Sequence, residues 1–266
     1  MNNAKITIAV VCPTYNSEKF IIDALLSVVN QTRKPDEIII SDDGSVDTTV
    51  SIASRFAHEH KQFTISVLEN VHQGPGAARN HGIKRSRSEW IALLDSDDLW
   101  YPEKLAIVEQ HISQYPEYNL FCHSEVKKNV VGHDSPLYYY KDYNPNKDLV
   151  RQLYWKNFFS TSAVVCRKDL FEKAGYFNEH LYSAQDYEMW LRMAPWMKPY
   201  HIRDILGVYR LHQGNISSAS FRKRYKNALT VLNTHRPQVG WGLYSVRTLK
   251  ISLSFFKSYI LDNGKL

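Results

Sequence analysis

The first hundred residues alternate short runs of β-branched and aliphatic side chains with longer stretches of helical periodicity. The strand-like runs are residues 6–12, 37–41, 63–69 and 90–94, and the helical stretches are 18–30, 48–58 and 76–86. Alternation of this kind is typical of α/β proteins, in which helices cover both faces of a parallel sheet. The expected fold class is therefore α/β with a mostly parallel central sheet.

Polar segments follow three of these strand-like runs. They are Pro-Thr-Tyr-Asn at 13–16, Asp-Asp-Gly-Ser at 42–45 and Asp-Ser-Asp-Asp at 95–98. Ligands of open α/β sheets bind beyond the carboxyl ends of the strands. We therefore expect the three segments to meet at one edge of the sheet and to contain the functional residues.

Three carboxylates lie within the four residues that follow the run 90–94: Asp95, Asp97 and Asp98. Crowded carboxylates raise one another's pKa values or recruit a counter-charge, and oxygen ligands suit Mg²⁺ or Mn²⁺. A polar turn before a helix that begins near Pro102 is the alternative, and Asp98 alone would serve as its cap. The cluster by itself leaves both interpretations open.

The other two segments fit a nucleotide diphosphate. Tyr15 offers a flat face to a base, Asp43 can accept the imide N–H of uracil or thymine, and a cation at 95–98 would neutralise the diphosphate. Taken singly, Tyr15 also fits a strand-end aromatic residue, and 42–45 also fits a turn with a helix cap. The combination favours the nucleotide.

Composition narrows the class of protein. The 266 residues are 44% hydrophobic and 23% charged, enough for one sizeable core and a small appended lobe. Cys12, Cys122 and Cys166 lack metal-ligand spacing, which favours a reducing compartment. Neither a long apolar run nor a signal peptide is evident, so we expect a cytoplasmic protein that does not span a membrane.

The second half has a looser pattern. It predicts helices at 102–113, 168–174 and 185–192, strands at 120–124, 162–166 and 202–211, and an irregular segment at 127–157. Gly175 is a suitable end for the second of these helices.

The segments at 13–16 and 95–98, Ser-Asp-Asp-Gly-Ser at 41–45 and Gly-Pro-Gly-Ala-Ala-Arg-Asn-His-Gly at 74–82 have the order and spacing of family 2 glycosyltransferases. The chain resembles that family over roughly residues 5–215, and in particular enzymes of bacterial surface-polysaccharide assembly. The resemblance implies a GT-A fold that binds a nucleotide-diphospho-sugar, Mn²⁺ or Mg²⁺ as cofactor, and sugar transfer with inversion at the anomeric carbon.

The resemblance also implies roles for single residues. In the donor site, Pro13 and Tyr15 would contact the base, Asp43 would read its N3–H, and Asp95 would lie near the ribose, with Ser96 a further donor-binding residue. Asp97 would bind the metal directly, with Asp95 near its water shell. These roles leave Asp98 consistent with a helix cap.

Further site residues come from later motifs. Gly74 and Gly76 permit close backbone approach, and Arg79 would reach the diphosphate or, alternatively, pair with an inward carboxylate. Arg210 and His212 resemble a late family element near the diphosphate, with His212 a candidate metal ligand.

Family members carry a Glu-Asp pair at the start of a helix, where this chain has Gln185-Asp186. We expect Asp186 to be the general base, and helix capping is the alternative role.

The tail differs in charge from the body. Residues 222–266 contain nine Lys and Arg residues and one acidic residue, Asp262, although the whole chain has a net charge of only +6. A basic tail beside a slightly acidic body does not favour nucleic-acid binding. We expect a catalytic domain at 1–220, with a nucleotide-sugar half at 1–100 and an acceptor half at 101–220, followed by a basic helical extension at 221–266.

Helical spacing within 246–261 separates two sides. Arg247, Lys250, Ser254 and Lys257 lie on one side, and Leu249, Leu253, Phe256 and Ile260 lie on the other. Such a helix would bind an anionic membrane surface on the cytoplasmic side, or its apolar side would pack on the catalytic domain. The sequence leaves the two alternatives open.

The leading hypothesis is an inverting, metal-dependent hexosyltransferase that uses a nucleotide-diphosphate sugar, with UDP the favoured nucleotide. Its acceptor would be a hydroxyl of a lipid-linked saccharide in bacterial polysaccharide or lipopolysaccharide O-antigen biosynthesis. Transfer to a polyprenyl phosphate and a non-catalytic nucleotide-sugar-binding module are the alternatives. The sugar, the acceptor and the linkage stay undetermined.

Overall fold

A computed structural model of the chain describes residues 5–129, 134–212 and 221–263, of which 221 and 258–263 are described through their backbone alone. Within these residues, nine strands form one sheet in the order β3-β2-β1-β4-β8-β6-β9-β5, with β7 paired to β6. The strands are β1 (Ile8–Thr14), β2 (Glu37–Asp42), β3 (Ile65–Glu69), β4 (Trp90–Leu93), β5 (Leu99–Trp100), β6 (Leu120–Lys128), β7 (Ser135–Leu137), β8 (Val164–Arg167) and β9 (Pro199–Arg210).

The sheet has a parallel half and a mixed half. Strands β3, β2, β1 and β4 run parallel, as the sequence predicts. Strand β8 then lies antiparallel to both β4 and β6, while β9 is parallel to β6. The α/β fold is therefore confirmed, and the sheet as a whole is mixed.

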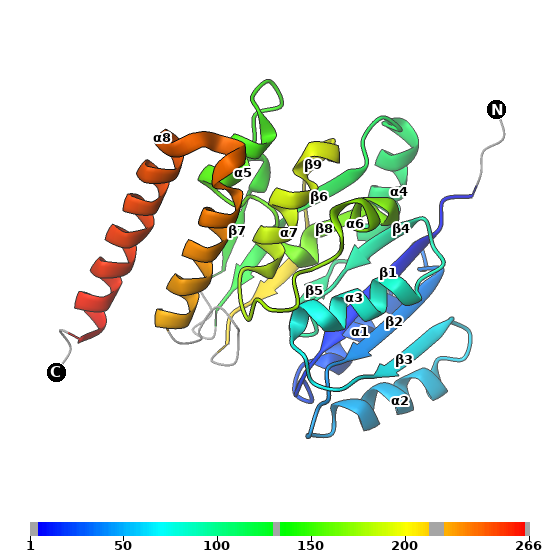
Figure 1. Cartoon of the computed structure of the whole chain (residues 1–266). Helices are drawn as coiled ribbons and strands as arrows, with labels where there is room; N and C mark the ends of the chain where they lie inside the picture. The colour runs from blue at the N-terminus through cyan, green and yellow to red at the C-terminus, as the bar shows by residue number, and fades with distance from the viewer. Residues whose placement is uncertain (1–4, 130–133, 213–220, 264–266) are drawn as a thin grey trace.

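Helices cover both faces of the sheet (Figure 1). They are α1 (Ile21–Val29), α2 (Thr49–Glu59), α3 (Pro75–Arg85), α4 (Lys104–Gln114), α5 (Leu149–Trp155), α6 (Lys168–Ala174), α7 (Gln185–Met193) and α8 (Phe221–Asn263), with 3₁₀ turns η1 (Tyr139–Asp142), η2 (Thr161–Ala163) and η3 (Ala194–Trp196).

Strand β1 contributes to the two apolar layers alternately. Ala9 and Val11 pack in a cluster with residues of α3, α5, α6, α7 and α8, whereas Ile8 and Val10 pack in a second cluster with α1, α2 and α4. A strand that is buried on both faces needs apolar side chains at every position. This requirement explains the unbroken run of aliphatic residues at the start of the chain.

The segment 127–157 is more regular than expected. It contains the end of β6, β7, η1 and α5. Helix α5 begins at a capped residue, because the side chain of Asp148 accepts a hydrogen bond from the backbone N–H of Arg151. Helix α5 was not predicted from sequence, because it is too short to show a clear helical periodicity and follows a segment rich in Asn, Lys and Pro.

The C-terminal segment expected to be helical at 221–266 is helical over its described residues, but it is interrupted by a turn. Helix α8 consists of two helices that meet at Gly240, whose φ of 79° and ψ of 168° are non-helical, and Figure 1 shows the two lying antiparallel as a hairpin. The Tyr225 and Ser252 hydroxyl oxygens are 2.7 Å apart across the hairpin. The side chain of Ile260 lies outside the described residues. Among the described helices, none is long and apolar enough to cross a membrane.

Candidate functional site

The parallel strands β1, β2 and β4 all end at the edge of the sheet that the sequence singled out, where Thr14 of β1 is in register with Asp42 of β2. Asp42 is buried and accepts hydrogen bonds from Thr14 Oγ1 at 2.9 Å, Ser45 N at 2.8 Å and Ser45 Oγ at 2.5 Å. Asp42 therefore joins the two loops to each other and is not available for a ligand.

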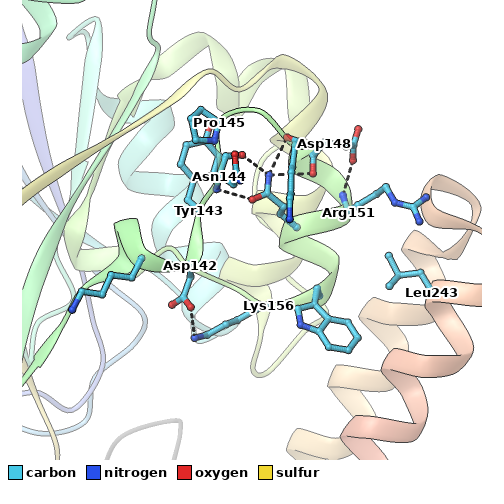
Figure 2. Close-up of a pocket in the computed structure, with 12 residues that line it drawn as sticks. Asp142, Tyr143, Asn144, Pro145, Asp148, Arg151, Lys156 and Leu243 are labelled. Carbon is cyan, nitrogen blue, oxygen red and sulfur yellow. Dashed lines mark hydrogen bonds and ion pairs between the residues drawn. The ribbon is translucent and has the colours of Figure 1, made fainter.

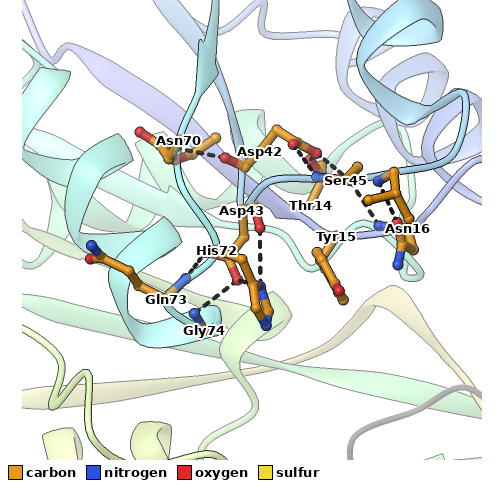
Figure 3. A network of polar contacts seen from close by, with 12 residues as sticks. Thr14, Tyr15, Asn16, Asp42, Asp43, Ser45, Asn70, His72, Gln73 and Gly74 are labelled. Carbon is orange, nitrogen blue, oxygen red and sulfur yellow. Dashed lines mark hydrogen bonds and ion pairs between the residues drawn. The ribbon is translucent and has the colours of Figure 1, made fainter.

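Asp43 organises the loop before α3, as Figure 3 shows. Its carboxylate accepts the backbone N–H groups of Gln73 and Gly74, each at 2.9 Å, and lies 2.8 Å from His72 Nδ1. Gly74 has a φ of 102°, a conformation that a side chain would disfavour. Asp43 and Gly74, both expected in the donor site, are thus in direct contact.

Tyr15 lies beside this loop with 44% of its surface exposed. Its ring stacks on the imidazole of His72, with 4.4 Å between the ring centroids. Pro13, the other expected base contact, is buried in β1 opposite Ser41. His72 was not among the expected site residues, because nothing in its local sequence pattern indicates that its ring stacks on Tyr15.

Helix α3 lies unusually close to β1. A Cβ atom on Gly82 would lie 2.5 Å from Val11 Cγ1, and one on Gly76 would lie 3.0 Å from the Asn178 carbonyl oxygen. This close approach buries Arg79 at the end of the sheet, where its Nη2 is 2.6 Å from Asp95 Oδ1. Of the two roles expected for Arg79, the structure shows the ion pair with an inward carboxylate, that of Asp95.

The three carboxylates of residues 95–98 have three different partners. Asp95 pairs with Arg79, Asp97 Oδ2 is 2.9 Å from His212 Nε2, and Asp98 accepts from Ser162 Oγ at 2.6 Å and from Arg210 N at 3.0 Å. Burial raises the pKa of Asp97, and the negative charge of Asp95 raises it further, against the lowering effect of His212. Burial also raises the pKa of Asp98.

Strand β9 brings Arg210 and His212 to this loop. Arg210 donates through Nε to the Asp97 carbonyl and through Nη1 to Asp23 Oδ2 at 3.0 Å. The His212 ring lies 4.2 Å from that of Phe20. Two residues more than a hundred positions from Asp97 in sequence therefore fix its backbone and its carboxylate.

Ser162 connects the carboxylate loop to the second half of the sheet. Its Oγ accepts from Asp95 N at 3.1 Å while it donates to Asp98, and its carbonyl accepts from Lys104 Nζ at 2.7 Å and Trp100 Nε1 at 2.8 Å. Lys104 is completely buried, and burial lowers its pKa well below the usual range. Neither Ser162 nor Lys104 was among the residues expected from sequence.

The remaining expected donor residue, Ser96, is 8% exposed and its Oγ lies 2.7 Å from Ser17 Oγ. It therefore tethers the carboxylate loop to the segment that follows β1.

Asp186 is half-buried in the first turn of α7, after Ala184 in a left-handed conformation with φ of 62°. Burial raises the pKa of Asp186, while the charges of Arg79 and Asp95 act on it in opposite directions. Asp186 therefore lies within electrostatic range of Arg79 and Asp95. Gln185 is buried, and its Oε1 has no hydrogen-bond partner among the described residues.

A surface cavity of about 810 Å³ lies elsewhere, between η1, α5 and the hairpin, and Figure 2 shows its lining. Lys156 pairs with Asp142 at 2.8 Å inside it. None of the expected site residues lines this cavity, so the sequence-derived site and the cavity are separate.

The chain is similar to known proteins over the region that contains these motifs. The family model described as Glycosyl transferase family 2 matches residues 9–175. A curated relative from Campylobacter jejuni, GalNAc(5)-diNAcBac-PP-undecaprenol beta-1,3-glucosyltransferase, is 27% identical over 82% of this chain and 70% of its own length.

Solved structures share the fold. S. aureus TarS 1-349 in complex with UDP-GlcNAc superposes with a TM-score of 0.71 at 24% identity, over 92% of this chain and 71% of that one. The mannosyltransferase PcManGT from Pyrobaculum calidifontis, in complex with GDP-Man and Mn2+, has a TM-score of 0.69 at 16% identity, over 99% of this chain and 77% of that one.

Proposed function

Because the chain belongs to glycosyl transferase family 2 and is a glycosyltransferase, we propose that it moves a hexose from a UDP-sugar to a hydroxyl of a lipid-linked saccharide, with inversion and with Mn²⁺ or Mg²⁺. The observation that carries this proposal is the pairing of Asp97 with His212 beside Asp95 and Arg79, at the edge of the sheet where Asp43 and Tyr15 lie.

The donor's base would bind at Tyr15 and Asp43, with Gly74 beside them, while the buried residues Pro13 and Ser96 would hold the surrounding loops in place. Asp43 Oδ1 accepts the Gln73 N–H and has a further lone pair for the N3–H of uracil, whereas Oδ2 accepts the Gly74 N–H and lies 2.8 Å from His72 Nδ1. His72 would move off the Tyr15 ring, or stay and leave the opposite face to the base. The UDP-GlcNAc complex of TarS supports UDP as the carrier.

The donor set of the carboxylate loop fits a divalent cation. Among the described residues no group of three or more His, Cys, Asp and Glu side chains is gathered as a ready cation site. Asp97 and His212 nevertheless offer an oxygen and a nitrogen 2.9 Å apart, and the pKa of Asp97 is raised by burial and by Asp95. Mg²⁺ and Mn²⁺ commonly take few protein ligands and complete their shells with phosphate oxygens and water.

We assign Asp97 and His212 as the direct ligands and Asp95 as a contact near the water shell or the ribose. When bound, the cation would neutralise the diphosphate leaving group. Arg79 and Arg210, both held near this loop, would add positive charge on the same side.

Asp186 would act on the acceptor. Its carboxylate takes the proton of the acceptor hydroxyl as that oxygen bonds to the anomeric carbon and the bond from this carbon to the diphosphate oxygen breaks. A raised pKa makes Asp186 a stronger base than an exposed aspartate. Because the attacking and leaving oxygens lie on opposite faces of the sugar, the configuration inverts.

The acceptor is proposed from the relatives. The Campylobacter jejuni enzyme is named for an undecaprenol-diphosphate-linked saccharide. An acceptor of that chemistry would hold this protein at the cytoplasmic face of the membrane, in bacterial polysaccharide or lipopolysaccharide O-antigen assembly, with the basic hairpin α8 as its contact to an anionic surface.

A donor screen tests the proposal. Purified full-length protein is incubated with single nucleotide sugars, with Mn²⁺ or with excess EDTA, and release of nucleoside diphosphate is measured. We expect release from one UDP-hexose only, and only with the cation. Equal release in EDTA would contradict the metal assignment, and release from GDP-mannose alone would contradict UDP.

A further inference from the structure

The second helix of the hairpin carries a stripe of exposed apolar side chains. Four of them, Val246, Leu249, Leu253 and Phe256, have between 55% and 62% of their surface exposed. Their spacing of three, four and three residues places them along one side of a helix. We call these four residues the outer stripe.

The outer stripe is not the face by which this helix packs. Ile251 is 9% exposed in the core cluster, and Tyr244 and Phe255 pack partly buried against the same cluster. The inner residues therefore hold the helix on the protein while the outer stripe stays uncovered. Packing of Leu249, Leu253 and Phe256 on the catalytic domain, one of the two alternatives from sequence, is wrong.

Positive charge borders the outer stripe. Lys250 and Lys257 are exposed one position after Leu249 and Phe256, and Lys250 Nζ lies 4.2 Å above the Trp155 ring on α5. From 221 to 261 the sequence contains no Asp or Glu. A surface that pairs apolar side chains with lysines, and lacks acidic residues, complements a negatively charged interface.

The corner of the hairpin has the same character. Trp241 is 66% exposed, and the Arg236 guanidinium lies 4.1 Å from the centre of its ring. Tryptophan and arginine each combine an apolar body with a polar end, which suits the boundary between lipid headgroups and acyl chains.

We propose that the outer stripe, with Lys250, Lys257 and Trp241, docks on the surface of an anionic lipid bilayer. This inference deepens the proposed function, because a lipid-linked acceptor would be presented at that surface. A second copy of this chain fits less well, since stripe-to-stripe contact would bring the lysines of both copies together, with no acidic partner between residues 221 and 261.

Vesicle co-sedimentation of the full-length protein tests the proposal. Vesicles of phosphatidylcholine alone are compared with vesicles of equal parts phosphatidylcholine and phosphatidylglycerol, at low and high salt. We expect binding to the anionic vesicles that weakens at high salt, because exposed charges are screened. Recovery of the wild-type protein in the supernatant with both vesicle types would overturn the proposal.

Two variants locate the contact. Leu249→Gln/Leu253→Gln/Phe256→Gln removes apolar surface without touching the packed side of the helix, and should lower the vesicle-bound fraction at least about tenfold. Ile22→Gln/Leu26→Gln is the matched control, since both side chains are exposed on α1 at 36% and 39%. The control should bind vesicles as the wild type does, and equal binding by the triple variant would contradict the proposal.

Two further measurements separate the remaining explanations. If the wild type is a dimer by light scattering and the triple variant is a monomer, the stripe is a self-association surface and the membrane proposal fails. Release of UDP without vesicles should be the same in the triple variant and the wild type. A protein that binds vesicles but releases no UDP would contradict the proposed function while leaving the docking surface intact.

Discussion

At the scale of single residues, the carboxylates of 95–98 are distinguished by their partners rather than by their spacing. Asp98 is 1% exposed and is held by Ser162 and Arg210, so it stabilises the loop. Asp97 has a more accessible carboxylate beside His212. The two neighbouring aspartates should therefore respond differently to substitution.

We expect Asp97→Asn to abolish the effect of Mn²⁺ on UDP binding, because the neutral amide is a poor cation ligand. Calorimetric titration with UDP, with and without Mn²⁺, should show an affinity gain of about tenfold or more in the wild type and none in the variant. Asp98→Ala serves as the comparison. It should keep the gain and lose about 1–3 kcal/mol of unfolding free energy, because a buried hydroxyl and a backbone N–H lose their acceptor. Loss of the Mn²⁺ effect in both variants would contradict this division.

We expect Asp186→Asn to lower the turnover rate by about 10²–10⁴-fold with unchanged UDP affinity, because only proton removal from the acceptor is lost. Turnover is measured with a hydroxyl acceptor at saturating donor. A near-wild-type rate would instead favour a polyprenyl phosphate acceptor, which is already an anion and needs no base.

The pH dependence of kcat/KM should reflect the ionisation of Asp186. Burial raises the pKa of Asp186 from 3.8, so its carboxylate gains a proton, and base catalysis is lost, at a higher pH than for an exposed aspartate. The acid limb of the wild-type profile should therefore lie above the ordinary aspartate range. Full activity down to about pH 4 would contradict the assignment.

At the scale of elements, the turn between the two helices of α8 depends on the backbone conformation of one glycine, as a comparison of Gly240 with Gly242 shows. Neither Gly240 nor Gly242 would bring an added Cβ within 4 Å of another residue, but only Gly240 has a positive φ, of 79°. The two sites differ in backbone conformation and not in available space. They form a matched pair.

We expect Gly240→Ala to lower the free energy of unfolding by about 1–3 kcal/mol, because φ and ψ there suit only glycine. Gly242→Ala, inside the helix, should raise it by about 0.5–1 kcal/mol. Urea denaturation followed by circular dichroism measures both. Equal effects of the two substitutions would show that the corner does not depend on the conformation of Gly240.

At the scale of the whole molecule, the hairpin is part of the core. Val231, Leu232, Val239 and Ile251 are each no more than 9% exposed in the cluster that covers one face of the sheet. Asn227 Nδ2 also donates to Ser183 Oγ at 3.0 Å, three residues before Asp186. The basic segment thus supports the loop that leads to the candidate base.

A chain shortened to residue 220 should therefore unfold at a lower temperature and aggregate. Removing four buried aliphatic residues costs about 1.5–3 kcal/mol each and uncovers the sheet face beneath them. Thermal unfolding monitored by scattering measures the change. The Leu249→Gln/Leu253→Gln/Phe256→Gln variant should keep the wild-type unfolding temperature, because it alters only exposed side chains. An unchanged unfolding temperature in the shortened chain would contradict the role of the hairpin in the core.

The order of polar segments after β1, β2 and β4 was readable from sequence, because strand ends are local signals and parallel strands bring them to one edge. The sequence therefore determined the fold class and the family, while the donor and acceptor roles of Asp43, Asp97 and Asp186 stay predictions. The partners of these residues were not readable. His72, Ser162 and Lys104 act through contacts between distant segments, which no local periodicity encodes.

The same distinction applies to the tail. Its helical spacing and its charge are properties of neighbouring residues, so the sequence determined a basic amphipathic helix. Which apolar side of that helix is covered depends on the other surfaces present, and only the tertiary structure decided it. Ile251, Tyr244 and Phe255 fill the space beside the core, which leaves the outer stripe exposed.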